Sequence, residues 1–290
     1  MNRLRRGVGW MWRHKIRTGG IVVGMLSVAW AVVYAVVALA VSPADQSVPL
    51  PDGRSLAYMI LQDAPPTARR VILVHGAPAN ASSWNLLLRK GAGDLAGLEI
   101  LAVDRLGYGN SSAGSELSLA EHARSLEPLL GDGVILVGHS YGGPVVLRAA
   151  AEFPDRVGGI VLVAGACDPY MNDSQITRRA INVVALAIPE PWVVANRELL
   201  ALTDENRDMI DLLDRVTCPV VVVHGTWDPV CPHDGTVGYL KRSLVSSSGV
   251  RVVSLERVGH NIHLTRPAVL AGEIRALAAS LDSTAHEGRR

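Results

Sequence analysis

The strongest constraint on the fold is a regular alternation of short apolar, β-branched runs with amphipathic stretches of helical periodicity. Strands that are apolar along their whole length are typical of a parallel sheet buried on both faces, with the intervening helices as its cover. We therefore predict an α/β protein with a mostly parallel central sheet and helices on both faces. The six strands predicted in this way cover residues 70–75, 98–104, 133–139, 158–164, 218–224 and 250–256.

Other elements are predicted around these strands. Residues 48–61 contain two extended segments on either side of the turn signal Asp52-Gly53. Amphipathic helices are predicted over 117–130 and 141–153.

The interval between 158–164 and 218–224 is too long for an ordinary crossover. It has helical pattern over 175–188 and 191–213 but no convincing strand. We therefore predict a helical cap insertion over about 166–217. Ligands of open α/β sheets bind outside the carboxyl ends of the strands, so an insertion leaving from such an end would cover the binding crevice.

The start of the chain differs in composition from the rest. Residues 1–17 hold six basic and no acidic residues, and residues 19–41 run for 23 positions without a charge. A helix of that length spans about 34 Å, which is enough to cross a hydrocarbon core of about 30 Å. The apolar stretch is also longer than the apolar region of a signal peptide.

We therefore expect a membrane-anchored protein with a single transmembrane helix at its N-terminal end. The positive-inside rule places the basic end in the cytoplasm and the body on the other side of the membrane. The alternative is a signal peptide cleaved at Ala38-Leu39-Ala40, which would give a secreted protein. The expected parts are a leader over 1–18, a signal anchor over 19–41, a linker over 42–47 and a body over 48–284.

The composition of the body excludes some partners. After residue 17 the chain carries 22 basic and 27 acidic residues, a net charge of −5, which argues against nucleic acid. Its cysteines, Cys167, Cys218 and Cys231, are too few for a disulfide framework and lack metal-site spacing. One bridge between Cys218 and Cys231 and three buried thiols both stay open. We expect no metal and no cofactor, and the sequence does not indicate an oligomeric state.

The pentapeptide Gly138-His139-Ser140-Tyr141-Gly142 matches G-x-S-x-G between a predicted strand and a predicted helix. Such a turn exposes the serine hydroxyl, which becomes a good nucleophile only beside a base that a carboxylate orients. In this architecture the acid and the histidine follow in that order, each after a later strand. Asp228 and His260 satisfy the order.

Each partner has competitors in the sequence. Asp104 also follows a strand, but the glycine-rich segment after it indicates a role in shaping a loop, and Asp234 lies at a predicted helix start. His263 is the rival base. The remaining candidates, His75, His139, His224 and His233, are expected to hydrogen-bond loops or to cover strand ends.

Three further motifs accompany this serine: His75-Gly76-Ala77-Pro78, the segment Asp104 to Ser111, and Gly259 to Leu264. With them, residues 48–281 resemble the α/β-hydrolase fold superfamily, in particular its group with a helical cap. The resemblance implies Ser140 as nucleophile, Asp228 as acid and His260 as base, with the backbone N–H groups of Ala77 and Tyr141 as oxyanion donors. Members that open epoxides or remove halides carry Asp where this chain has Ser140, which argues against those activities.

The expected function is a serine hydrolase that cleaves a hydrophobic or lipid-like carboxylic ester through a Ser-His-Asp triad and an acyl-enzyme. The apolar stretch Ile181 to Ile188, with Tyr170, Met171 and Trp192, could line an acyl pocket or could pack as a cap helix on the core. We expect Trp84 and Trp227 to pack loops. The alternatives are an amidase, a small peptidase or a carbon–carbon bond hydrolase with the same triad, and a non-catalytic binding protein that kept the fold.

Overall fold

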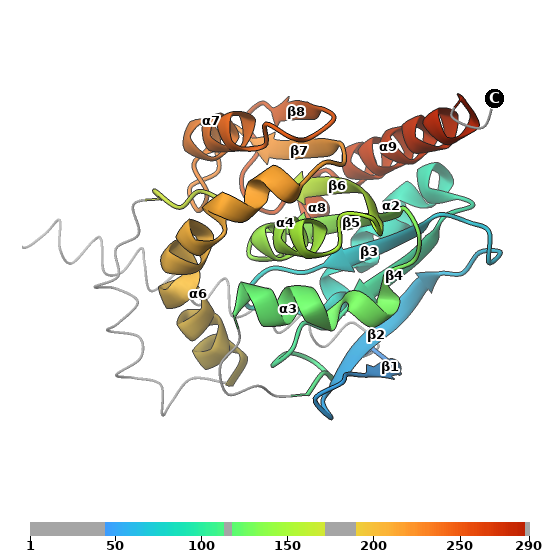
Figure 1. Ribbon diagram of the computed structural model, residues 1–290, viewed down its shortest axis with the longest axis horizontal. Coiled ribbons are helices and arrows are strands. Elements are labelled where there is room, and N and C mark those ends of the chain that lie inside the picture. The colour runs from blue at the N-terminus through green and yellow to red at the C-terminus, as the bar shows by residue number, and fades with distance from the viewer. Residues whose placement is uncertain (1–43, 113–117, 172–189, 288–290) are drawn as a thin grey trace, which may run out of the picture. The chain divides into compact units, whose positions relative to one another are not determined.

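The computed structural model describes residues 44–112, 118–171 and 190–287. Within these residues the strands form an eight-stranded sheet in the order β1-β2-β4-β3-β5-β6-β7-β8 (Figure 1). β1 pairs antiparallel with β2, β2 pairs antiparallel with β4, and all other neighbours are parallel. The strands are β1 (Gln46–Pro49), β2 (Ser55–Gln62), β3 (Arg70–Val74), β4 (Glu99–Val103), β5 (Val134–His139), β6 (Val157–Val163), β7 (Val220–Gly225) and β8 (Val250–Leu255).

This arrangement confirms the predicted mostly parallel sheet. Each of the six predicted apolar strands is present, with its ends within two residues of the prediction. The two extended segments predicted over 48–61 are β1 and β2, which form the antiparallel edge. β1 begins at Gln46, inside the segment that was expected to be a linker.

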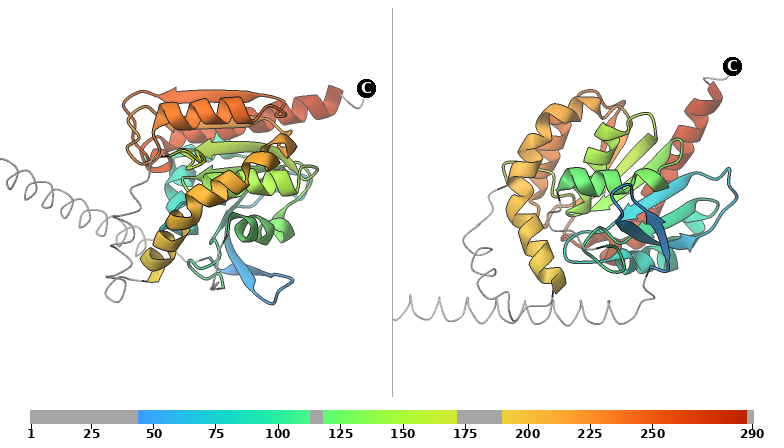
Figure 2. Two further views of the ribbon diagram at one scale, coloured as in Figure 1. Left: turned by 60° about the vertical axis from the view of Figure 1, so that its left-hand side comes forward. Right: turned by 60° about the horizontal axis from the view of Figure 1, so that its bottom comes forward.

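Helices cover both faces of the sheet (Figures 1 and 2). Successive strand residues point to opposite sides, so Ile72 and Val74 pack with one group of helices and Val71 and Leu73 with the other. The first group contains α3 (Leu119–Ser125), α4 (Gly142–Glu152) and α7 (His233–Ser243), and the second contains α2 (Asn85–Leu95), α8 (Ile262–Thr265) and α9 (Pro267–Glu287).

The helix predicted over 117–130 is shorter than expected. α3 starts after the capping residue Ser118, and Glu127–Leu129 continue as a 3-10 turn. Pro128 has no N–H to donate, which explains why the α-helical hydrogen bonding stops before it.

The predicted cap interval is mostly helical over 190–215, whereas its first described residues, 166–171, form neither helix nor strand. α6 (Glu190–Asp208) and the 3-10 helix η4 (Ile210–Arg215) lead into β7. Glu205 of α6 accepts a hydrogen bond from the N–H of Leu119, and Asn206 donates to the carbonyl of Ala166, which follows β6. These contacts place α6 at the end of the sheet from which the loops after the strands leave. The helix expected over 175–188 lies outside the described residues.

The N-terminal predictions also lie outside the described part of the chain. The basic leader, the apolar segment 19–41 and the first two residues of the expected linker all fall within residues 1–43. Among the helices that the structure describes, none has the length and apolar character that a bilayer span requires.

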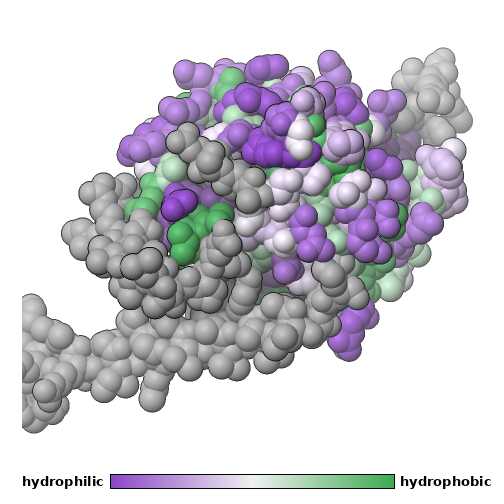
Figure 3. Space-filling model, turned by 90° about the horizontal axis from the view of Figure 1, so that it is seen from below, coloured by the Kyte–Doolittle hydropathy of each residue, from purple (hydrophilic) through white to green (hydrophobic). Residues whose placement is uncertain are grey.

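Cys167, Cys218 and Cys231 are buried free thiols, so the bridge between Cys218 and Cys231 does not form. In the view from below, the coloured surface is mostly hydrophilic to neutral, with hydrophobic residues in separate groups left of centre and at the lower right (Figure 3).

Candidate active site

Ser140 lies in a sharp turn between β5 and α4 and has a backbone φ of +53°. Residues other than glycine seldom adopt this left-handed conformation, and they do so where the surroundings hold them. Here the N–H of Ser140 donates to the carbonyl of Val163 (3.0 Å), and its own carbonyl accepts from Gly143 and Ala166 (both 2.9 Å). A Cβ on Gly142 would lie 2.3 Å from the carbonyl oxygen of Val74, so the start of α4 needs a glycine.

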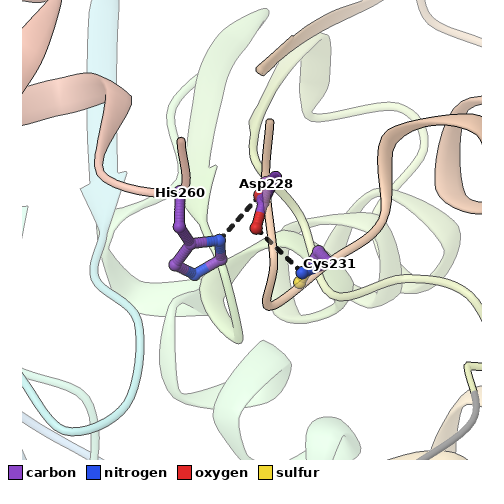
Figure 4. Close-up of side chains that lie close together, drawn as sticks. All are labelled: Asp228, Cys231 and His260. Carbon is purple, nitrogen blue, oxygen red and sulfur yellow. Dashed lines mark hydrogen bonds and ion pairs between the residues drawn. The ribbon is translucent and has the colours of Figure 1, made fainter. Parts of the chain in front are cut away.

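The structure brings the three predicted side chains together. Ser140 Oγ lies 2.9 Å from His260 Nε2, and His260 Nδ1 lies 2.8 Å from Asp228 Oδ2. Figure 4 shows the imidazole and the carboxylate facing each other across the loops that follow β7 and β8. The two loops are tied together, because the N–H of Trp227 donates to the carbonyl of Val258 at 3.0 Å.

Asp228 is held by its own turn. Its Oδ1 accepts hydrogen bonds from the backbone N–H groups of Val230 (2.8 Å) and Cys231 (2.9 Å). Burial opposes ionisation, but His224, His260 and the Cys231 N–H together keep the pKa of this carboxylate well below its ordinary value. Asp228 is therefore charged at neutral pH and can orient an imidazole.

The same residues could also be considered as metal ligands. Ligand atoms of Asp228, His260 and Cys231 lie within 4.8 Å of one another (Figure 4). Both oxygens of Asp228 already accept hydrogen bonds, however, and both nitrogens of His260 face Asp228 and Ser140. The donor set therefore fits a hydrogen-bonded triad better than it fits a cation.

The loop that carries Ala77 passes directly beside Ser140. A Cβ on Gly76 would lie 2.9 Å from the Cβ of Ser140. Among the described residues, neither the N–H of Ala77 nor that of Tyr141 has an acceptor, which leaves both N–H groups available to a ligand. The geometry is compatible with the oxyanion donors that the resemblance implies, and their role stays a prediction.

The rival carboxylates are engaged elsewhere. Asp104 accepts hydrogen bonds from the N–H groups of Ala81 and Asn110 (both 2.8 Å), so it joins two loops as expected. Asp234 is exposed and pairs with His233 at 2.8 Å. Within the described ranges, neither is hydrogen-bonded to Ser140 or His260.

Three histidines at the ends of strands anchor the loops of the site, as expected. A carbonyl oxygen only accepts, so the ring nitrogen that contacts it carries the proton. Burial lowers the pKa of His75 and His139 well below the ordinary value, so both are neutral donors. The bonds run from His75 Nδ1 to Gly76 (2.6 Å), from His139 Nε2 to His260 (3.2 Å) and from His224 Nε2 to Cys231 (2.8 Å).

The rival base His263 is buried against the rings of Trp84 and His139, with centroid distances of 5.2 and 4.1 Å. Burial, aided by the nearby His260, lowers the pKa of His263 to about 3. His263 therefore stays neutral in the folded protein and becomes charged at moderately acidic pH only on unfolding.

This burial predicts an acid-sensitive fold. The folded-state pKa lies below that of the unfolded chain, so the stabilisation is complete above about pH 6.5 and is lost as the pH falls toward 3. His263→Phe should reduce the pH dependence of the free energy of unfolding in this window by up to about 1.4 kcal/mol per pH unit. Urea unfolding at several pH values between 7 and 4 measures it, and an unchanged slope would contradict the assignment.

Sequence reasoning missed the partners of Arg105. This side chain follows β4 and is buried together with Glu198 of α6, 93 residues away in the sequence. The position of Arg105 directly after a predicted apolar strand indicated that its side chain could be buried. Nothing in the sequence identified Glu198 as the carboxylate that pairs with it.

Comparisons with known proteins agree with the fold. A protein of Mycobacterium bovis described as uncharacterized is 27% identical over 215 residues, which cover 56% of this chain and 62% of that protein. An esterase of Mycobacterium tuberculosis is 32% identical over 143 residues, 47% of this chain and 46% of the esterase. The chain thus spans less than two thirds of the length of these curated relatives.

A thermophilic esterase from Thermogutta terrifontis has a similar structure, with a TM-score of 0.64 and 20% identity over 81% of this chain and 99% of that chain. At this identity the likeness shows the fold alone. The curated relative and the solved structure thus both agree with the predicted fold. Residues 71–273 match the profile described as the alpha/beta hydrolase family, and the chain therefore belongs to that family.

Proposed function

We propose that the protein is a serine hydrolase that cleaves a carboxylic ester through an acyl-enzyme on Ser140. The observation that carries the proposal is the continuous chain of hydrogen bonds from Ser140 Oγ through His260 to Asp228, with 2.9 and 2.8 Å between the paired atoms. A hydroxyl, an imidazole and a charged carboxylate in this order are what an activated serine requires.

In the first half of the reaction, Ser140 Oγ attacks the ester carbonyl carbon and its proton passes to His260 Nε2. The carbonyl oxygen becomes an oxyanion, which the N–H groups of Ala77 and Tyr141 stabilise. When the intermediate collapses, the bond from carbon to the alcohol oxygen breaks and His260 returns the proton to the departing alkoxide. Asp228 holds the imidazole in the required tautomer and stabilises its positive charge.

In the second half, water replaces the alcohol. His260 Nε2 takes a proton from the water as the oxygen attacks the acyl carbon, and the same donors hold the second oxyanion. Collapse breaks the bond to Ser140 Oγ, which regains its proton from His260, and the carboxylic acid leaves.

A hydrophobic substrate is supported by the surface beside Asp228. Trp227 is 67% exposed, and Val230 on the other side of Asp228 is also exposed. The expectation that Trp227 packs a loop was therefore wrong, while Trp84 is buried as expected. Exposed large apolar side chains next to a catalytic group favour binding of an apolar acyl or alcohol group.

A membrane location is part of the same proposal. The uncharged segment 19–41 and the basic residues before it are the support for a signal anchor with the hydrolase domain outside the cytoplasm. Fractionation of the full chain, followed by protease treatment of intact cells, tests the topology. A mature protein that begins near Val41 would identify a cleaved signal instead.

The chemical proposal is tested with p-nitrophenyl esters of graded acyl length beside the matching anilides. We expect the esters to be cleaved, with a preference for chains longer than acetyl. Faster cleavage of the anilides would indicate an amidase. A folded protein that hydrolyses neither series and is not labelled by a fluorophosphonate probe would identify a non-catalytic member of the family.

A further inference from the structure

A buried ion pair joins α6 to the loop after β4. Arg105 is 1% exposed and Glu198 is 3% exposed. The guanidinium donates to both carboxylate oxygens, with Nη1 to Oε1 at 2.5 Å and Nη2 to Oε2 at 3.0 Å. Tyr108 Oη (2.6 Å) and His122 Nε2 (2.8 Å) donate to the same carboxylate, which therefore receives four hydrogen bonds.

The pair is charged in the folded protein. Burial by itself would raise the pKa of Glu198, but the attraction of Arg105 and the hydrogen bonds from His122 and Arg105 lower it to about 2. Removing the carboxylate would leave the guanidinium buried without a counter-charge, a situation that proteins avoid by moving the group. The Glu198 carboxylate therefore holds the Arg105 guanidinium in its buried position.

The rest of Arg105 contacts the residue before Ala77 and the ring of Tyr141, and Ala77 and Tyr141 are the two residues that are expected to hold the oxyanion. Its Nε donates to the carbonyl of His75 (3.1 Å), and its Nη2 donates to the carbonyl of Gly76 (3.4 Å). The Gly76 carbonyl and the Ala77 N–H belong to one planar peptide group, so holding the first fixes the direction of the second. The guanidinium carbon also lies 4.5 Å from the ring centroid of Tyr141.

We propose that Glu198 and Arg105 are positioning residues for the oxyanion hole, and that they couple α6 to it. The inference rests on the proposed function, because it concerns how the predicted donors are aimed. Glu198 fixes the guanidinium, and the guanidinium helps His75 to hold the Gly76–Ala77 peptide, so that the Ala77 N–H keeps its direction toward the substrate carbonyl. The guanidinium also supports the Tyr141 ring. A hydrogen bond to the carbonyl side of a peptide also strengthens its N–H as a donor.

Glu198→Gln tests the proposal with an ester and its thionoester analogue. A thiocarbonyl sulfur is a poor hydrogen-bond acceptor, so the thionoester gains little from the oxyanion donors. We expect kcat/KM for the ester to fall about 10- to 100-fold, mainly through kcat, because small misplacements of catalytic groups have effects of that size. The value of kcat/KM for the thionoester should fall much less, so the ratio of the ester rate to the thionoester rate should decrease by about tenfold.

Two other variants separate positioning from general damage. Glu205→Gln changes a carboxylate on the same helix that bonds the N–H of Leu119 at 3.0 Å, and it should leave the ratio unchanged. Tyr108→Phe removes one donor to Glu198 while keeping the charged pair, and it should shrink the ratio by a smaller factor. If Glu198→Gln does not fold, the ester-to-thionoester rate ratio of Tyr108→Phe tests the proposal in its place.

Equal losses on ester and thionoester would overturn the coupling, because a purely structural role lowers both rates together. The same holds if Glu205→Gln changes the ratio as much as Glu198→Gln does. Failure of the proposed function would look different, since the unaltered protein would then hydrolyse neither substrate.

Discussion

Ser140→Ala should lower ester hydrolysis by about 10⁴- to 10⁶-fold and abolish labelling by a fluorophosphonate probe. The hydroxyl is the atom that would form the acyl-enzyme, and no other group at this position can replace it. Alanine has a Cβ as serine does, so the positive φ of the turn costs both residues the same. The free energy of unfolding should therefore change little, and the loss can be assigned to chemistry.

Initial rates with the best ester and labelling of the purified protein measure this effect. Ser283→Ala is a suitable control, because Ser283 is exposed on α9 and bonds only the carbonyl of Ser280 among its described neighbours. The control should be labelled like the unaltered protein. Activity within tenfold of normal in Ser140→Ala would remove Ser140 from the nucleophile position.

Asp228→Asn should reduce kcat by about 10⁴-fold with little change in KM. The carboxylate accepts a hydrogen bond from His260 Nδ1, which leaves Nε2 free to take the proton of Ser140. An amide that turns its NH₂ toward Nδ1 would stabilise the opposite tautomer, with the proton on Nε2. The imidazole could then no longer act as a base toward the serine.

The matched control is Asp234→Asn, which changes the rival carboxylate in the first turn of α7. Asp234 is exposed and contacts His233 rather than the triad, so its variant should keep nearly full activity. If Asp234→Asn were the more damaging of the two, the acid would have been assigned to the wrong residue. Pre-steady-state bursts with p-nitrophenyl esters would also show that Asp228→Asn slows acylation itself.

The fold was largely predictable because its strands carry their own pattern. Segments such as 134–138 and 220–223 are apolar throughout, and only a sheet covered on both faces buries all of their side chains. Helix ends were less predictable, since one proline in 127–129 converts the expected last turns of α3 to 3-10 geometry. The exposure of Trp227 could not be predicted, because the sequence of a loop does not determine which of its side chains point toward solvent.

The meeting of the three candidate side chains was predictable for a different reason. Ser140, Asp228 and His260 each follow a parallel strand, and parallel strands end at one edge of the sheet, so chain order alone places them together. The partner of Arg105 was not predictable, since Glu198 comes from a helix whose path over the sheet is set by tertiary packing. Sequence reasoning thus finds groups attached to the sheet and misses those supplied by the insertion.

The histidines at the ends of β3, β5 and β7 suggest how such a molecule can diversify. Each holds a loop of the candidate site through a hydrogen bond to a main-chain carbonyl, and any residue substituted in the loop would still provide that carbonyl. Side chains farther along these loops, such as Trp227 and Val230, can then be exchanged without disturbing the anchor. Specificity and catalytic geometry are in this sense separable, and libraries that vary the loop tips while keeping His75, His139 and His224 should retain a working triad.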